Sequence, residues 1–214
     1  MSSKKFAEGI NAKKLFWIFL FGCVFGTIWE MSYHFIQHGE IVSRSALIYG
    51  PFNPVYGLGA LVFASIVNIK NPIKLFLTGM GLGGFCEYVC SLVQEKVFGT
   101  VAWDYSDQFL NFNGRTSIAI MVFWGFLAIV FVKVIYPYLS RMIESIPLEF
   151  GNILTVSLAL FMAFNCVISV SACLRQKERE KGIKATNEIS VFLDRHYPDE
   201  RLNKIYVNSY KKEK

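Results

Sequence analysis

Long apolar stretches separated by short polar ones dominate the chain. Five of these stretches lie at residues 15–37, 46–69, 73–97, 116–136 and 153–174. Each is close to the roughly 20 residues that an α-helix needs to cross about 30 Å of hydrocarbon. The pattern therefore predicts an all-α fold, a polytopic transmembrane helix bundle of about five spans in a lipid bilayer.

The polar stretches divide the chain into parts. Residues 1–14 form a basic N-terminal segment, 15–72 a first two-helix repeat, 73–137 a second two-helix repeat, 138–174 a connector and the last transmembrane helix, and 175–214 a charged C-terminal tail. The tail mixes lysine and arginine with glutamate and aspartate. Such a mixture is typical of a solvated or lipid-facing segment, so we expect no binding of nucleic acid.

Composition supports a membrane protein, because 53% of the residues are hydrophobic and only 18% are charged. The net charge of +6 comes mostly from the two ends of the chain. Basic flanks normally lie in the cytoplasm, but five spans place the two ends on opposite sides of the bilayer. The charge pattern therefore leaves the orientation open.

The first and third apolar stretches carry the same motif, in which two glycines and a glutamate follow one another at intervals of four residues. The motif is formed by Gly22, Gly26 and Glu30 and again by Gly79, Gly83 and Glu87. Residues at this spacing share one helix face. We expect the glycines to be helix-packing positions where another backbone approaches closely. The glutamates should then point into the bundle, toward each other.

The stretches that follow also match. The sequence "YGLGALVF" from Tyr56 resembles "WGFLAIVF" from Trp124, and "RSALI" from Arg44 resembles "RTSIA" from Arg115. Each half therefore reads as a glycine-rich helix with an acid, a polar connection, an arginine and a second helix. Because each half holds two spans, the pattern predicts parallel repeats related by an axis along the membrane normal.

Ionisable residues inside the spans mark the candidate site. A charged group there costs on the order of 3 kcal/mol unless it is paired or hydrated, and Arg44 and Arg115 are the expected partners of Glu30 and Glu87. Two interpretations remain open and are compatible. The pairs are either buried ion pairs that fix the bundle or the lining of a polar cavity.

The connection "VAWDYSDQFLNFNGR" of the second half is rich in polar and interfacial residues and predicts a lid over this cavity. It adds four residues to the site: Trp103, Asp104, Tyr105 and Asn113. In the first half, His34 lies one helical turn beyond Glu30. We predict no catalytic residue, no metal site and no cofactor.

The segments "RSALIYGPFNPVYGLGA", "WDYSDQFLNFNGR" and "WGF" resemble the ABC-transporter type IV, or CmpB-like, family of bacterial multi-pass membrane proteins. The resemblance covers roughly residues 16–131. It implies a membrane component assigned to transport and located in the bacterial cell (inner) membrane. The sequence has no G-x-x-x-x-G-K-[ST] phosphate loop, so ATP would be hydrolysed by a separate ATPase subunit.

Three functions fit these residues. The first is a permease-like component that forms a homo-oligomer or joins an ATPase subunit. The second is a membrane-embedded enzyme acting on a lipid-linked substrate, with Glu30 or Asp104 as general base and His34 as acid or base, although no catalytic triad spacing supports it. The third is a structural or assembly protein. We favour the permease.

Overall fold

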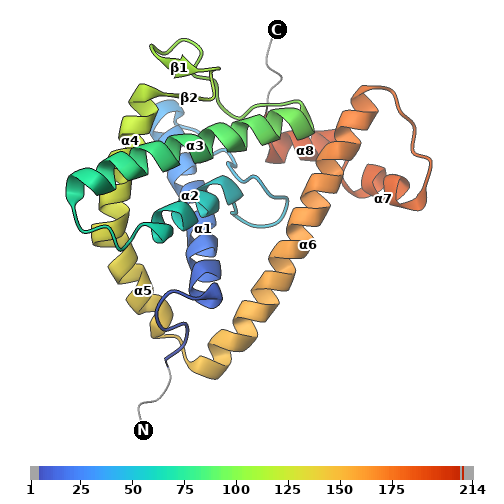
Figure 1. The fold of residues 1–214 in the computed structure, drawn as a ribbon. Helices are drawn as coiled ribbons and strands as arrows, with labels where there is room; N and C mark the ends of the chain where they lie inside the picture. The colour runs from blue at the N-terminus through green and yellow to red at the C-terminus, as the bar shows by residue number, and fades with distance from the viewer. Residues whose placement is uncertain (1–4, 208, 210–214) are drawn as a thin grey trace.

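The computed structural model describes residues 5–207 and 209, which form a mainly helical structure (Figure 1). The helices are α1 (Ala12–His38), α2 (Pro54–Ser65), α3 (Pro72–Phe98), α4 (Ile118–Val130), α5 (Tyr136–Glu144), α6 (Leu148–Glu180), α7 (Glu188–His196) and α8 (Asp199–Ile205). A π-helical turn, η1 (Phe131–Ile135), joins α4 to α5. Two short antiparallel strands, β1 (Asn111–Phe112) and β2 (Thr116–Ser117), make a hairpin before α4.

Four helical segments of the described chain are long and apolar enough to cross a membrane: α1, α3, the continuous segment Ile118–Glu144, and α6. The prediction of a full span at 46–69 is not met, because α2 has 12 residues and is therefore only about 18 Å long. Proline explains the difference, since Pro51 and Pro54 cannot donate the backbone hydrogen bonds of a helix interior. Pro54 instead starts α2, and the Asn53 side chain caps it by accepting from the Val55 N–H.

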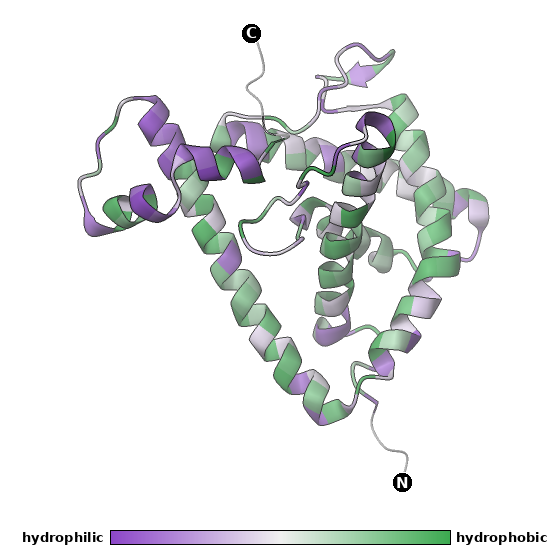
Figure 2. Cartoon of the chain, turned by 180° about the vertical axis from the view of Figure 1, so that it is seen from behind, coloured by the Kyte–Doolittle hydropathy of each residue, from purple (hydrophilic) through white to green (hydrophobic). Residues whose placement is uncertain are grey.

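The helices do not form a simple parallel bundle. Helix α1 stands between α4–α5 on one side and α6 on the other, while α2 and α3 run across them (Figure 1). Helices α5 and α6 meet near the N-terminal end of the molecule and diverge from there, and both views agree on this (Figures 1 and 2). The first turns of α1 and helix α8 lie at opposite ends of the molecule (Figure 1).

An apolar core and an ion pair with a buried lysine hold the N-terminal end together. Trp17 and Ile18 of α1 pack with Phe63, Leu75 and Phe131 from three other elements. The ion pair joins the same helix to α5. Lys14, which is fully buried, donates to Glu144 at 2.5 Å and to Ser140 at 2.6 Å. Removing the Glu144 carboxylate would leave the buried ammonium group of Lys14 without a counter-charge.

The long helices are largely apolar, as the green ribbon in Figure 2 shows, and large apolar side chains are exposed on them. Ile153, Leu160 and Val167 of α6 are each exposed by at least two thirds. They lie seven residues apart, on one face of the helix. A bilayer would cover this face.

Helix α4 passes into α5 through a wider turn because of a proline. Pro137 has no N–H to donate to the carbonyl four residues before it, and its ring would clash there. The chain accommodates this with η1, in which the Tyr136 N–H bonds to the Phe131 carbonyl five residues back.

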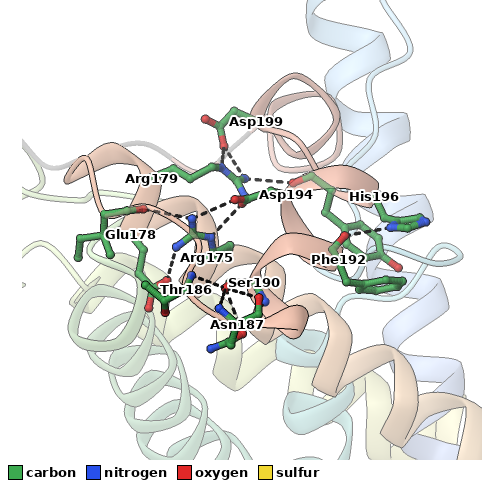
Figure 3. Close-up of polar contacts among 12 residues, drawn as sticks. Arg175, Glu178, Arg179, Thr186, Asn187, Ser190, Phe192, Asp194, His196 and Asp199 are labelled. Atoms are coloured by element: carbon green, nitrogen blue, oxygen red, sulfur yellow. Dashed lines mark hydrogen bonds and ion pairs between the residues drawn. The ribbon is translucent and has the colours of Figure 1, made fainter.

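The C-terminal residues fold back on α6 as a small cap, formed by residues 175–206. Two arginines on the last turns of α6 hold it (Figure 3). Arg175 Nε lies 2.9 Å and Arg179 Nη1 2.6 Å from Asp194 Oδ1, and Arg179 Nη2 lies 2.5 Å from Asp199 Oδ1. The hydrogen bonds from Arg175 and then Arg179 lower the pKa of Asp194 to about 2. Apolar contacts among Ala172, Leu193, Tyr197 and Leu202 complete the cap.

Candidate functional site

The glycine faces of α1 and α3 lie against the helices that follow them. An added Cβ would fall 2.8 Å from the Ala60 Cβ at Gly22 and 2.0 Å from Tyr56 Cγ at Gly26. The second pair of helices has the same arrangement. An added Cβ would fall 2.2 Å from the Ala128 Cβ at Gly79 and 2.5 Å from the Trp124 Cβ at Gly83. Only glycine allows the partner helix to come this close.

One turn beyond each glycine face, a glutamate meets the aromatic residue that packs on it. Glu30 accepts a hydrogen bond of 2.6 Å from the Tyr56 hydroxyl. Glu87, only 7% exposed, accepts from Trp124 Nε1 and from the Tyr105 hydroxyl, both at 3.2 Å. Tyr56 and Trp124 therefore make the same kind of contact in the two helix pairs.

The two glutamates share one polar cluster. Tyr56 donates to Glu30, and it also lies within electrostatic range of Glu87 and Tyr105. We define the central cluster as Glu30, Tyr56, Glu87, Tyr105 and Trp124. Its members come from α1, α2, α3, the second connection and α4, so every element of both helix pairs contributes to it.

The space beside this cluster is small. A mostly apolar hollow is lined by Val55, Gly59, Phe63, Gly83, Cys86, Glu87 and Trp124. It has room for about one water molecule. The arrangement therefore holds a buried carboxyl group next to a water-sized space, and a larger solute would enter only if the helices moved apart.

Arg44 lies in the non-helical residues 39–53, and its side chain contacts the C-terminal part of α1. Its Nη2 atom lies 2.5 Å from His34 Nδ1. Because an arginine can only donate, His34 accepts through Nδ1 and keeps its proton on Nε2. The Nε atom of Arg44 is buried without a hydrogen-bond partner in the described part of the chain. Arg44 also acts electrostatically on Glu30.

Arg115 does not make the ion pair with Glu87 that we expected. It pairs with Glu95, two turns further along α3, and its guanidinium lies 5.5 Å from the centre of the Tyr88 ring. The hairpin explains this choice, since it places Arg115 beside the end of α3 and leaves Glu87 to Tyr105 and Trp124.

The second connection, residues 99–117, folds on itself. Trp103 Nε1 donates to the Arg115 carbonyl at 2.9 Å, and the Tyr105 N–H donates to the Gly114 carbonyl at 2.7 Å. Asp104 accepts from the N–H and hydroxyl of Ser106 and so fixes a turn. Tyr105 thus reaches the central cluster, whereas Asp104 stabilises the loop.

Asn113 belongs to the hairpin turn. It has a positive φ of 54°, a conformation that asparagine adopts more readily than most residues. Its Nδ2 atom donates to the Tyr88 hydroxyl at 2.9 Å. Asn113 therefore ties the hairpin to α3 and lies apart from the central cluster.

The first connection, residues 39–53, is held from outside by α6. Asn165, fully buried in the middle of that helix, accepts from the Tyr49 N–H at 3.1 Å and donates to the Tyr49 carbonyl at 2.7 Å. Ser169 accepts from the Ile48 N–H at 2.9 Å. Non-helical backbone at membrane depth needs such partners. Sequence reasoning missed both residues, although a lone asparagine within the apolar run "FMAFNCVISV" was a visible signal.

The cap also touches this connection. The hydroxyl groups of Tyr49 and Tyr197 lie 2.7 Å apart, and Ile48 packs against the apolar cluster of the cap. The first connection is therefore enclosed between α6 and the C-terminal cap.

Comparison with known proteins identifies a family for most of the chain. The family model described as "Putative ABC-transporter type IV" matches residues 17–170, which is more than two thirds of the chain. No curated protein and no solved structure matches the chain. The matched range holds both glutamates and both connections, while α7 and α8 lie beyond it.

Proposed function

The chain belongs to the ABC-transporter type IV family, and we propose that it is a permease-like component of a bacterial inner membrane. The central cluster would be its binding site for a small charged solute, with a proton or small cation fitting best. The observation that carries this proposal is the pair of glutamates between apolar helices, each held by an aromatic hydrogen-bond donor.

A carboxyl group at this position is costly to keep and is usually retained for a function. Glu87 accepts hydrogen bonds from two neutral donors, Tyr105 and Trp124, and its expected arginine is bound to Glu95 instead. When a carboxyl group in such surroundings is ionised, it can take up a proton or bind a cation. This chemistry suits a positively charged solute better than an anion.

We also propose that the two helix pairs are duplicated repeats that move against each other during transport. Their matched contacts support this, because Tyr56 and Ala60 meet Gly26 and Gly22 as Trp124 and Ala128 meet Gly83 and Gly79. The hollow beside Glu87 has room for about one water. A change in the distance between the pairs would widen it.

A partner chain completes the proposal. The sequence has no phosphate loop, so in an ATP-driven system a separate ATPase subunit would supply the energy. The exposed apolar face of α6 offers room for lipid or for a second copy of the chain. Purification from native membranes in mild detergent, followed by identification of bound chains and an ATPase assay, tests this part.

The central experiment replaces Glu30 and Glu87 by glutamine. Glutamine keeps an oxygen that can accept from Tyr56 and Trp124, so the fold should survive while the titratable group is lost. Proteoliposomes containing a pH-sensitive dye would report proton entry driven by a potassium diffusion potential. We expect proton entry to fall at least about tenfold in the double variant.

Glu149→Gln is the matched control, because Glu149 is exposed on the first turn of α6. It should leave proton entry unchanged. Equal proton entry in the double variant and the unaltered protein would contradict the proposal. Loss of folded protein on size-exclusion chromatography would point instead to a structural role for the glutamates.

A further inference from the structure

We propose that α7 lies in the membrane interface, with Ile189 and Phe192 inserted among the lipid chains and Lys181, Lys184 and Arg195 bound to anionic lipid headgroups. This interaction surface is independent of the proposed transport function. Three separate observations carry it: the height of α7 along α6, the exposure of its outer face, and the position of its cations.

The height of α7 follows from what its inner face contacts. Leu193 and the adjoining Tyr197 pack in one cluster with Ala172 of α6, and Ile168 packs against the same cluster. Both α6 residues belong to the apolar stretch 153–174, which a bilayer would cover. Helix α7 is therefore level with the end of that stretch. Figure 1 shows the end of α6 rising past α7 before the chain turns back.

The outer face of α7 exposes large apolar side chains. Ile189 is 71% exposed and Phe192 46% exposed, and they lie three residues apart on one helix face. Ile183, in the loop before the helix, is 49% exposed. In the described residues, these three side chains keep about half or more of their surface exposed. An apolar helix face at the height of a membrane surface is the pattern of an interfacial helix.

Five of the cations near α7 belong to two groups. Arg175 and Arg179 point into the cap and bind its aspartates (Figure 3). Lys181, Lys184 and Arg195 are exposed, and none of the ion pairs found in the described residues includes them. Exposed basic residues beside an interfacial helix attract anionic lipids.

The remaining polar groups of α7 are already engaged or exposed. Its N-terminus is closed by a capping box between Asn187 and Ser190, so the helix end offers no anion site of its own. Its two acids are Glu188, exposed in the first turn, and Asp194, which is bound to the arginines of α6. On α7 and in the loop before it, Lys181, Lys184 and Arg195 are therefore the cations that attract anionic lipid.

The test uses the full chain in lipid nanodiscs. A fluorescent amino acid is introduced at Ile189, and the nanodiscs contain phosphatidylglycerol and lipids brominated near the headgroup end of their chains. Bromine quenches a nearby fluorophore, so we expect about a twofold loss of intensity at position 189. The control places the same fluorophore at Glu180, on the last turn of α6, where we expect no loss.

A charge variant separates electrostatic binding from simple proximity. Replacing Lys181, Lys184 and Arg195 by glutamine should reduce the quenching at position 189, while Lys204→Gln on α8 should not. Equal quenching at positions 189 and 180 would overturn the proposal. Quenching that is unaffected by the triple variant, or crosslinking of position 189 to another protein instead of lipid, would also overturn it.

Discussion

The helix pairs α1–α2 and α3–α4 share their internal contacts but hold their connections in different ways. In both pairs a glycine face meets an aromatic residue and an alanine of the following helix. The first connection, however, depends on Asn165 and Ser169 of α6, far away in the sequence. The second is closed by its own hairpin.

This difference separates contacts that the local sequence determines from contacts that depend on distant residues. Helix contacts at intervals of four residues are encoded locally, so both pairs can reproduce them. A non-helical connection must instead find partners for its backbone groups, and the two connections found different ones. The contacts that hold the two connections therefore differ, while the helix pairs beneath them share the same contacts.

The strongest test of the shared contacts is to fill the glycine faces. Gly26→Leu would place a Cβ 2.0 Å from the Tyr56 ring, and Gly83→Leu one 2.5 Å from the Trp124 Cβ. We expect each to cost roughly 3 kcal/mol or more, and the melting temperature to fall by about 10 °C. Gly26→Leu should have the larger effect.

Gly81→Leu is the control, because nothing lies within 4 Å of a Cβ added there. It is on the same helix as Gly83 and should melt close to the unaltered protein. Similar melting temperatures for all three variants would refute the close-contact role of the glycines.

Asn165→Leu tests the difference between the connections. Loss of the amide leaves the N–H and carbonyl of Tyr49 without partners, at about 1–3 kcal/mol for each buried group. Hydrogen exchange should become faster in residues 44–52 and stay unchanged in 103–116. Asn111→Ala should do the reverse, since Asn111 accepts from Gly114 and donates to Gln108 within the hairpin. Uniform changes in both connections would show that they are not independent.

The smallest effect concerns the pH dependence of the cap that supports the first connection. The pKa of Asp194 is lowered to about 2 in the folded cap, against about 3.9 for an unperturbed aspartate. A lowered pKa means that the stabilisation is complete above pH of about 4 and is lost as the pH falls toward 2.

Hydrogen exchange of α7 and α8 between pH 5 and 2.5, corrected for the intrinsic exchange rate, would measure this loss. We expect protection to fall at the acidic end and Asp194→Asn to remove the titration. The change should be modest, because the Asp194 side chain is 31% exposed. A flat profile in the unaltered protein would contradict this account.

The sequence predicted the local features of the molecule well. The long apolar stretches located the helices that became α1, α3 and α6. This prediction succeeded because the length and composition of an apolar stretch are properties of residues that are neighbours in the sequence. The family resemblance was also confirmed, and the match extends to residue 170.

Features that depend on distant partners could not be predicted. The spacing from Arg115 to Glu87 and to Glu95 was known, but the hairpin that decides between them was not. Asn165 was visible as a lone amide, yet its partner lies 116 residues away. The full span expected at 46–69 failed for a different reason. Pro51 and Pro54 interrupt this apolar stretch, so its length exceeds the length of the helix that it can form.

The wide turn η1 determines the direction in which the side chains of α5 point. One extra residue in a turn rotates the later part of a helix by about 100° relative to an uninterrupted one. Ser140 and Glu144 thereby come to face Lys14 on α1. A protein with one residue fewer in Phe131–Ile135 could still be helical throughout, but Glu144 would turn away and leave a buried ammonium group alone. The single extra residue in η1 thus sets the rotation of α5, so that the segment after the second helix pair can pair with the N-terminal end of the chain.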